Sequence, residues 1–282
     1  MREVKLQTAF SMLELIFVIV ILGIVASIGS EVIAQIYEGY IVQRAQYRAS
    51  IKTELALNQI ANRLRYILPE TIVVRATIGA TAYPLSGIST TDDKVLQWVA
   101  YDGDSFESLS SEASSGNARR PGWSGFCDID AYTPGSTSLP TPGSNLDFTK
   151  TIIKNLGGDI ANAMIYFRAE DNPSYGISDG SSENITLDNA IPSKKRIYER
   201  YKLAWTSYAV EVDDNSDLIL HYSFAPIIGT NINGKSSILL KNVTNFRFKS
   251  SGSSLRIKIC KEEQIGTNST DTIHACKEKV IF

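Results

Sequence analysis

The sequence predicts an α+β protein in which one long amino-terminal helix packs on a β-rich globular head. Apolar residues crowd positions 10 to 36, and apolar residues then recur at helical spacing as far as residue 68. After Pro69, runs of β-branched and aromatic residues alternate with stretches rich in Ser, Gly and Asn, as strands and turns do. The 43% apolar and 21% charged content is typical of a folded chain, and the net charge of -2 gives no global reason to expect nucleic-acid binding.

The amino-terminal segment has the composition of a membrane span. Nine polar, slightly basic residues, MREVKLQTA, precede the apolar run FSMLELIFVIVILGIVASIG from Phe10 to Gly29. At 1.5 Å per residue the run matches the roughly 30 Å hydrocarbon core of a bilayer. We therefore expect residues 10–30 to be the transmembrane half of the helix, with the basic amino-terminal residues in the cytoplasm and the bulk outside.

Glu14 is the one charge in this run, and three interpretations of the segment treat it differently. A cleaved signal peptide would end near residues 27–29, but an acid at the start of its apolar core is unusual and the helical pattern continues past that point. In a plain membrane anchor, Glu14 would have no role, and its side chain would only extend to the membrane interface. A charge near the bilayer centre costs about 2.5–3.5 kcal/mol, so an acid in this run calls for a functional explanation. The third interpretation supplies a partner.

Residues 9–15, AFSMLEL, resemble the cleavage and methylation site of type IV prepilins and type II secretion pseudopilins. In that family a membrane-embedded aspartyl peptidase cuts before a residue that is usually Phe and then methylates the new α-amine. The resemblance implies removal of leader residues 1–9 by cleavage between Ala9 and Phe10, N-methylation of Phe10, and Glu14 at the fifth mature position as the filament-assembly residue. Ala9 stands where the family usually has Gly.

Cleavage would create a cationic amine at Phe10, one helical turn from Glu14. In a growing filament, the Glu14 carboxylate of an incoming subunit can meet the Phe10 amine of the subunit already above it. Two charges that are each costly in lipid then neutralise one another, which favours docking in one axial register. The twenty-second mature position is Glu31, where many major pilins of the family carry a proline, and this departure indicates a minor subunit.

Helical periodicity continues through residues 31–68, which we expect to form an amphipathic half of the helix lying against the head. Pro69 supplies the stop signal. In the head, residues 69–282, an acidic turn at 213–217 predicts a hairpin, and residues 103–147, rich in Ser, Gly and Pro, predict a long loop. The predicted strands are 71–78, 94–101, 163–168, 205–212, 218–224, 238–240, 245–249 and 255–260.

The carboxyl-terminal run SSILLKNVTNFRFKSSGSSLRIKIC resembles the last strands of J-type minor pseudopilins and W-type minor pilins. The resemblance implies a non-enzymatic structural subunit that helps to initiate or cap a filament for type II secretion, DNA uptake or pilus biogenesis. Its partners would be the prepilin peptidase, other pilins or pseudopilins, the inner-membrane assembly platform and membrane lipid, without a cofactor or a directly bound nucleic acid. It would sit in a bacterial inner membrane with a periplasmic head before joining the filament.

Three cysteines, Cys127, Cys260 and Cys276, lie in the part expected outside the membrane, where a disulfide can persist. Sequence alone leaves three pairings open, and free thiols are a further alternative. We favour Cys260–Cys276, because both lie in the last strands and enclose a short polar loop. Such a pair would also resemble the disulfide-bounded terminal region of many pilins, with Cys127 as a lone thiol.

No catalytic or metal-binding motif is evident in the chain. His221 and His274 lack metal-ligand spacing, and there is no nucleophile elbow, phosphate loop or CxxC. The acids Asp213, Asp214 and Asp217 lack the spacing of an EF-hand, so they fit a solvated hairpin turn better than a calcium site.

A charged run is the remaining candidate for a binding surface. We expect it to be a solvated face, since a single basic patch on a near-neutral chain is typical of one. Its members are Lys194, Lys195, Arg196, Arg200 and Lys202. The alternative from another class is a membrane-tethered periplasmic enzyme or ligand-binding protein, because acids distant in sequence can converge in a cleft.

Overall fold

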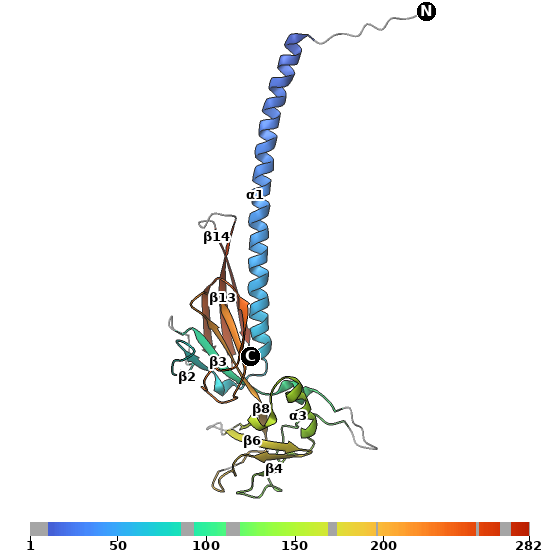
Figure 1. Cartoon of the computed structure of the whole chain (residues 1–282), viewed down its shortest axis with the longest axis vertical. Coiled ribbons are helices and arrows are strands. Elements are labelled where there is room, and N and C mark those ends of the chain that lie inside the picture. Colours follow the sequence, from blue (N-terminus) through green and yellow to red (C-terminus); the bar gives the residue numbers. More distant parts are fainter. Residues whose placement is uncertain are drawn as a thin grey trace, which may run out of the picture.

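The computed structural model describes residues 11–85, 93–110, 119–168, 174–195, 197–251, 254–265 and 272–281. One long helix, α1 (Met12–Leu64), extends from a two-lobed, β-rich head (Figure 1). α1 begins at Ser11, whose side chain accepts a hydrogen bond from the Glu14 backbone N–H, and it is capped at Arg65. It stops short of the predicted residue 68, because Ile67 already pairs with Ala100 of the neighbouring sheet. The α+β class is as predicted.

The first lobe consists of two antiparallel sheets packed around the carboxyl-terminal part of α1. The larger sheet has the described strand order β11-β10-β9-β3-β1-β2, and the smaller has the order β12-β13-β14. The strands of the larger sheet are β1 (Val73–Arg75), β2 (Tyr83–Pro84), β3 (Val95–Ala100), β9 (Thr206–Val212), β10 (Leu218–Phe224) and β11 (Lys235–Leu240). Those of the smaller sheet are β12 (Val243–Ser251), β13 (Ser254–Gln264) and β14 (Thr272–Ile281).

The core of this lobe is one apolar cluster shared by α1 and both sheets. Ile60 and Leu64 of the helix meet Trp98 of β3, Phe248 of β12 and Ile257 of β13, all essentially inaccessible to water. Burial of such side chains contributes about 1.5–3 kcal/mol each relative to exposure. The end of α1 is therefore held as an integral part of the first lobe.

The second lobe lies beyond the end of α1 and has its own core (Figure 1). Its sheet has the described order β4-β7-β6-β5-β8, and helix α3 (Leu146–Asn155) contributes buried side chains to the same core. Its strands are β4 (Ser138–Pro140), β5 (Met164–Phe167), β6 (Ser174–Ser181), β7 (Asn184–Leu187) and β8 (Tyr201–Ala204). Short helices are α2 (Gly103–Glu107), η1 (Pro69–Thr71), which precedes β1, and η2 (Ile160–Asn162).

The two lobes are joined through continuous backbone and a small apolar cluster. β8 of the second lobe runs through Trp205 directly into β9 of the first. Leu68, Val99 and Tyr166 pack together with Ala204 at this junction. The Tyr166 hydroxyl also donates a hydrogen bond to the Pro226 carbonyl. These contacts fix the second lobe below the end of the helix.

Each of the eight predicted strands overlaps an observed strand, and the hairpin across residues 213–217 is confirmed by the pairing of β9 with β10. A last strand was expected around Cys276, but the bounds of β14 were not predicted, because only Ala275 is buried along it and no apolar alternation marks it. Residues 103–147, predicted as a long loop, carry α2 and β4 and bury Trp123 and Leu139, so much of this segment is part of the second core.

Candidate functional site

The amino-terminal part of α1 has no buried side chain. From Met12 to Arg48 every residue is exposed except Ala45, which is partly so, and Ala49 is the first buried residue. This part contains an 18-residue stretch with a mean hydropathy of 2.7. Within the described chain, α1 is the one helix that is long and apolar enough to cross a membrane. Together with the cysteine pair described below, this fits a single-pass membrane protein with a disulfide.

The free part of α1 is longer than a bilayer requires. Residues 12–48 form about 55 Å of helix at 1.5 Å per residue, whereas a bilayer core is about 30 Å thick. We predicted that residues 31–68 would lie against the head, but side chains are buried there only from Ala49 onward, and Gln43, Gln46 and Tyr47 border a hollow beside β14. The amino-terminal part of the helix extends beyond the head, as Figure 1 shows.

An apolar stripe lies on this uncovered stretch beyond the predicted span. Ile33, Ile36, Tyr37 and Tyr40 recur at the spacing of one helix face, and each side chain is more than half exposed. Single exposed apolar residues are common, but a continuous stripe on a helix marks a surface that binds another apolar surface. The free stripe therefore presents an interaction face outside the head.

Glu14 lies in the first turn of α1 with its side chain exposed. Its backbone N–H is bound by the Ser11 cap, and no ion pair joins its carboxylate to another described residue. Ala9 and Phe10, the predicted cleavage and methylation residues, lie outside the described residues. The structure thus places Glu14 on the exposed apolar part of the helix.

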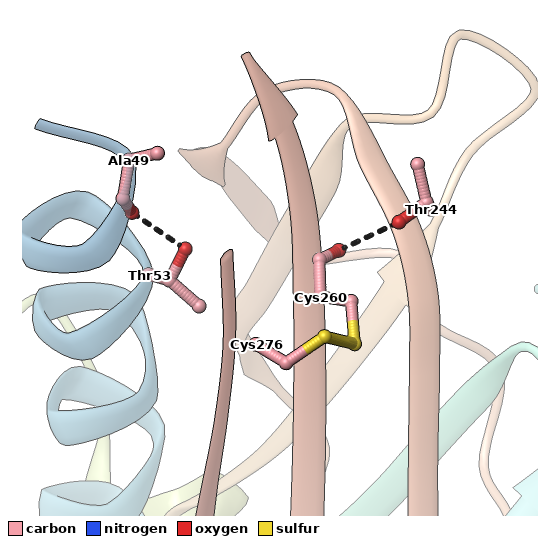
Figure 2. Close-up of a disulfide and its surroundings, with 5 residues drawn as sticks. All are labelled: Ala49, Thr53, Thr244, Cys260 and Cys276. Carbon is pink, nitrogen blue, oxygen red and sulfur yellow. Dashed lines mark hydrogen bonds between the residues drawn. A yellow bond between two sulfur atoms is a disulfide. The ribbon is translucent and has the colours of Figure 1, made fainter. Parts of the chain in front are cut away.

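The carboxyl-terminal part of α1 is docked on the last two strands. Its buried face begins with small residues, Ala49, Thr53 and Ala56, which allow β14 to approach closely. Thr53 donates its hydroxyl to the Ala49 carbonyl at 2.8 Å, so the buried hydroxyl is satisfied within the helix (Figure 2). Lys277 of β14 lies 3.6 Å from Glu54, at the exposed rim of this contact.

The disulfide joins the two strands behind this contact. The sulfur atoms of Cys260 on β13 and Cys276 on β14 are 2.10 Å apart, and the two residues are register partners (Figure 2). This is the pair that the sequence favoured. Cys127 is a buried free thiol in the second core, where burial raises the pKa of the thiol to about 12. It is therefore protonated and unreactive at neutral pH.

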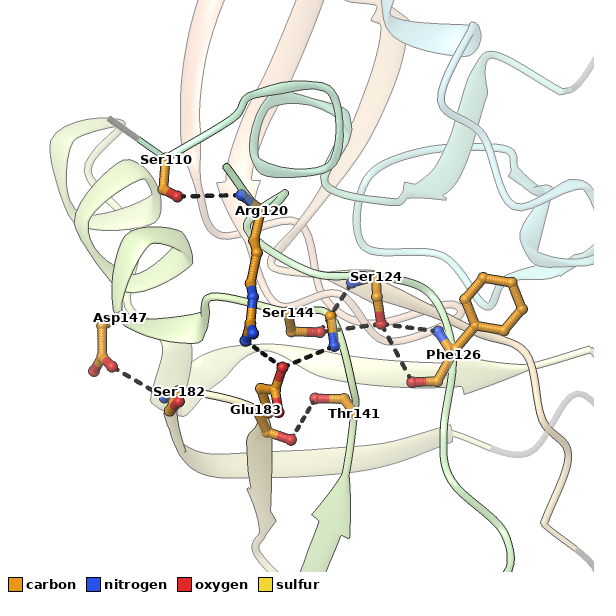
Figure 3. A network of polar contacts seen from close by, with 10 residues as sticks. Ser110, Arg120, Ser124, Phe126, Thr141, Ser144, Asp147, Ser182 and Glu183 are labelled. Carbon is orange, nitrogen blue, oxygen red and sulfur yellow. Dashed lines mark hydrogen bonds and ion pairs between the residues drawn. The ribbon is translucent and has the colours of Figure 1, made fainter. Parts of the chain in front are cut away.

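A polar network holds the 119–147 segment on the second lobe (Figure 3). Glu183, in the turn between β6 and β7, forms an ion pair with Arg120 and accepts a hydrogen bond from the Gly143 backbone N–H at 3.0 Å. The hydroxyls of Ser124 and Ser144 are 3.1 Å apart in the same network. These contacts come from positions far apart in sequence and fix the loop around Trp123.

The remaining candidate residues do not converge on a metal site. Asp213 accepts the backbone N–H groups of Asn215 and Asp217 at 3.0 and 2.7 Å, so its carboxylate organises the turn, as predicted. His221 lies 2.8 Å from Glu211 on the neighbouring strand, and no sequence motif indicates this nearly buried pair. Among the described residues no group of three or more His, Cys, Asp or Glu could hold a metal.

The residues of the basic run differ in their exposure to solvent. Lys194 and Lys195 are exposed, as expected of a solvated face, and Arg196 lies outside the described residues. Lys202 contradicts the expectation, because it is half-buried and its ammonium faces aromatic rings. Spacing alone does not reveal this placement, since the rings come from three distant segments.

Two hollows of the head are large enough to be considered as enzyme active sites. A groove of about 770 Å³ between the lobes is lined by Trp205, Asp159 and Asp188 and has no histidine among its described lining residues. A smaller hollow of about 250 Å³ includes Asp102, whose pKa burial raises to about 6. Asp102 caps α2 by accepting the Ser105 backbone N–H at 3.1 Å, which gives the carboxylate a structural role.

Comparison with family models, with curated proteins and with solved structures finds no match to this chain.

Proposed function

We propose that this chain is a minor pilin or pseudopilin: a membrane-anchored, non-enzymatic subunit whose α1 packs against the α1 helices of other subunits in a filament. The observation that carries the proposal is the length of helix left uncovered by the head. About 55 Å of α1 is exposed, and roughly 25 Å of it remains after a bilayer core is crossed. A plain anchor needs no such extension.

The apolar stripe on this extension supports helix packing. In water, the exposed rings and aliphatic chains of Ile36, Tyr37 and Tyr40 would remain hydrated at a cost in free energy. Packing them against the same face of another subunit removes that surface from water. The head would then project from a central bundle of helices.

Glu14 sets the register in this proposal. Cleavage before Phe10 leaves an α-amine close to the carboxylate of Glu14, and a neighbouring subunit offers the geometry in which the two charges neutralise one another. The Glu14 side chain is exposed, so its carboxylate is accessible to a partner from another subunit.

The same proposal sets the location. The chain would be held in a bacterial inner membrane, with the head and its disulfide in the oxidising periplasm, until the subunit helps to initiate or cap a filament. The prepilin peptidase, other pilins or pseudopilins and the assembly platform would be its partners. Secretion, DNA uptake and pilus growth are all served by filaments of this kind.

A second candidate function is ligand binding by the membrane-tethered head. The groove between the lobes favours it, because its volume lies in the range of small-molecule sites and Trp205 lines it. A Cβ on Gly158 would lie 2.5 Å from the Trp205 ring, so glycine is needed for the indole to lie against the backbone here.

Mass spectrometry of the protein extracted from membranes tests the filament proposal. We expect an amino terminus at N-methylated Phe10. A terminus at Ser30 or Glu31 would identify an ordinary signal peptide and contradict the proposal. In cells, Glu14→Ala should leave insertion and cleavage intact and reduce recruitment into filaments, whereas normal assembly of this variant would remove the charge-pairing role.

A further inference from the structure

Lys202 is a half-buried lysine that faces aromatic rings and no acid. Its Nζ atom lies 4.1 Å from the ring centroid of Tyr101, 5.2 Å from that of Phe106 and 5.8 Å from that of Trp123. These rings come from the end of β3, from α2 and from the 119–147 segment. No carboxylate of the described residues forms an ion pair with the ammonium, and Arg200 is the one charge that perturbs it. Among the described residues the lysine is thus held in place without a counter-ion.

A second cation lies on the same side of this strand. Arg200 is two residues before Lys202, and alternate residues of an extended strand point to the same face. Its guanidinium carbon lies 5.1 Å from the ring centroid of Phe126. Arg168 follows Phe167, which pairs with Tyr201, so a third exposed cation is at the same end of the sheet.

The arrangement is electrostatically unfavourable when empty. Burial, and then the neighbouring charge of Arg200, lower the pKa of Lys202. The aromatic faces offset part of this cost through cation–π attraction, but they supply no negative charge. An anion placed between Lys202 and Arg200 would relieve both the desolvation and the repulsion.

The backbone beside these cations is already occupied. The Tyr201 N–H donates to the Gly125 carbonyl at 3.1 Å, and the Leu203 carbonyl accepts the Asp102 N–H at 2.7 Å. A ligand strand therefore cannot add to this edge of the sheet. Recognition here depends on the side chains, whose positions are fixed by the packed loop and its polar network.

We propose that Lys202, Arg200 and Phe126 form a binding site for an acidic peptide segment of a partner protein. A carboxylate of the segment lies between the two cations, where charge-assisted hydrogen bonds are strongest. An apolar neighbour of that carboxylate packs on the exposed edges of Phe126 and Phe106, which are 41% and 37% exposed.

The small number of cations at the site favours a peptide ligand over a nucleic acid. Binding to a polynucleotide draws its affinity from many phosphate contacts, whereas two or three cations on a chain with a net charge of -2 match one or two carboxylates. The site lies beyond the carboxyl-terminal end of α1, where Tyr101 packs on Tyr66. The site does not involve the free part of the helix, so it does not depend on the proposed filament function. Failure of one proposal leaves the other intact.

Intrinsic fluorescence of the full-length protein in detergent tests the site, because Trp123 adjoins the Lys202 ammonium. The probe is a synthetic hexapeptide of five glutamates and one phenylalanine. We expect saturable binding that Lys202→Met and Arg200→Gln each weaken at least about ten-fold, as loss of one charge-assisted contact implies. Arg200 is exposed, so its variant should fold even if Lys202→Met does not. Lys154→Gln, at an exposed lysine on α3, is the matched control and should bind normally.

Four outcomes would overturn the proposal. The first is the absence of binding to the native chain, and the second is equal affinity in native protein and Arg200→Gln. Tighter binding of a single-stranded oligonucleotide than of the peptide would assign the patch to nucleic acid. Equal affinity for free glutamate would assign it to a small anion. A peptide with glutamine in place of every glutamate should not bind, since it lacks the carboxylates.

Discussion

The two parts of α1 differ in where their apolar face is buried, although both have helical periodicity. From Ala49 to Leu64 the face is covered by the first lobe, and Ile60 and Leu64 are inaccessible to water. From Met12 to Arg48 the helix is equally regular, yet its apolar side chains find no cover within the described chain. The docked part stabilises the head, whereas the free part is available to lipid and to other molecules.

Truncation of one isoleucine in each part of α1 should give the largest difference in the free energy of unfolding. Ile60→Ala removes a fully buried side chain and should lower the free energy of unfolding of the head by about 2–5 kcal/mol. Ile36→Ala, at a side chain that is 67% exposed, should change it by less than about 0.5 kcal/mol. Urea unfolding of the full chain in detergent, followed by tryptophan fluorescence, measures both. Equal effects would show that the two parts of the helix are not distinct.

Removal of the disulfide should weaken the platform on which the docked part lies. Cys260→Ser combined with Cys276→Ser opens a loop with a sequence separation of 16, for which chain entropy gives a loss of about 3 kcal/mol. The same unfolding experiment measures the loss, and reduction of the native protein should reproduce it. Insensitivity of the native head to reductant would contradict this role of the bond.

Acidity should act on the second lobe through Asp102. Burial raises the pKa of its carboxyl to about 6, above the ordinary value, so the folded state binds a proton that the unfolded state has lost. The contribution of Asp102 to the free energy of unfolding should therefore be largest below about pH 4. It should fall by about 2–3 kcal/mol as the pH rises to about 6. Asp102→Asn keeps an N-cap for α2 and should remove this part of the pH dependence.

Circular dichroism across the same pH range tests whether the free part of α1 is independent of the second lobe. The free part of α1 makes no buried contact with the head, so its helicity should not follow the pH response of the second lobe. Simultaneous loss of helicity along the whole of α1 would contradict the independence of its free part.

Sequence patterns predicted what local chemistry determines. The helix, the β9–β10 hairpin and the favoured cysteine pair all rest on periodicity, turn residues or proximity in the chain. The separate second core was not predicted, because Trp123, Leu139 and Ile165 come from segments with no common pattern. The rings around Lys202 were missed for the same reason, since only the tertiary fold brings them together.

Disulfide cross-linking between subunits in the membrane tests the central claim most directly. In a Cys127→Ser background, Ile36→Cys places a thiol on the apolar stripe, and Glu38→Cys places one elsewhere on the same exposed helix. We predict oxidised dimers for Ile36→Cys and few for Glu38→Cys, because neighbouring helices pack through the stripe. Equal cross-linking at both positions, or none at Ile36→Cys, would contradict the claim that the free part of α1 is an assembly surface.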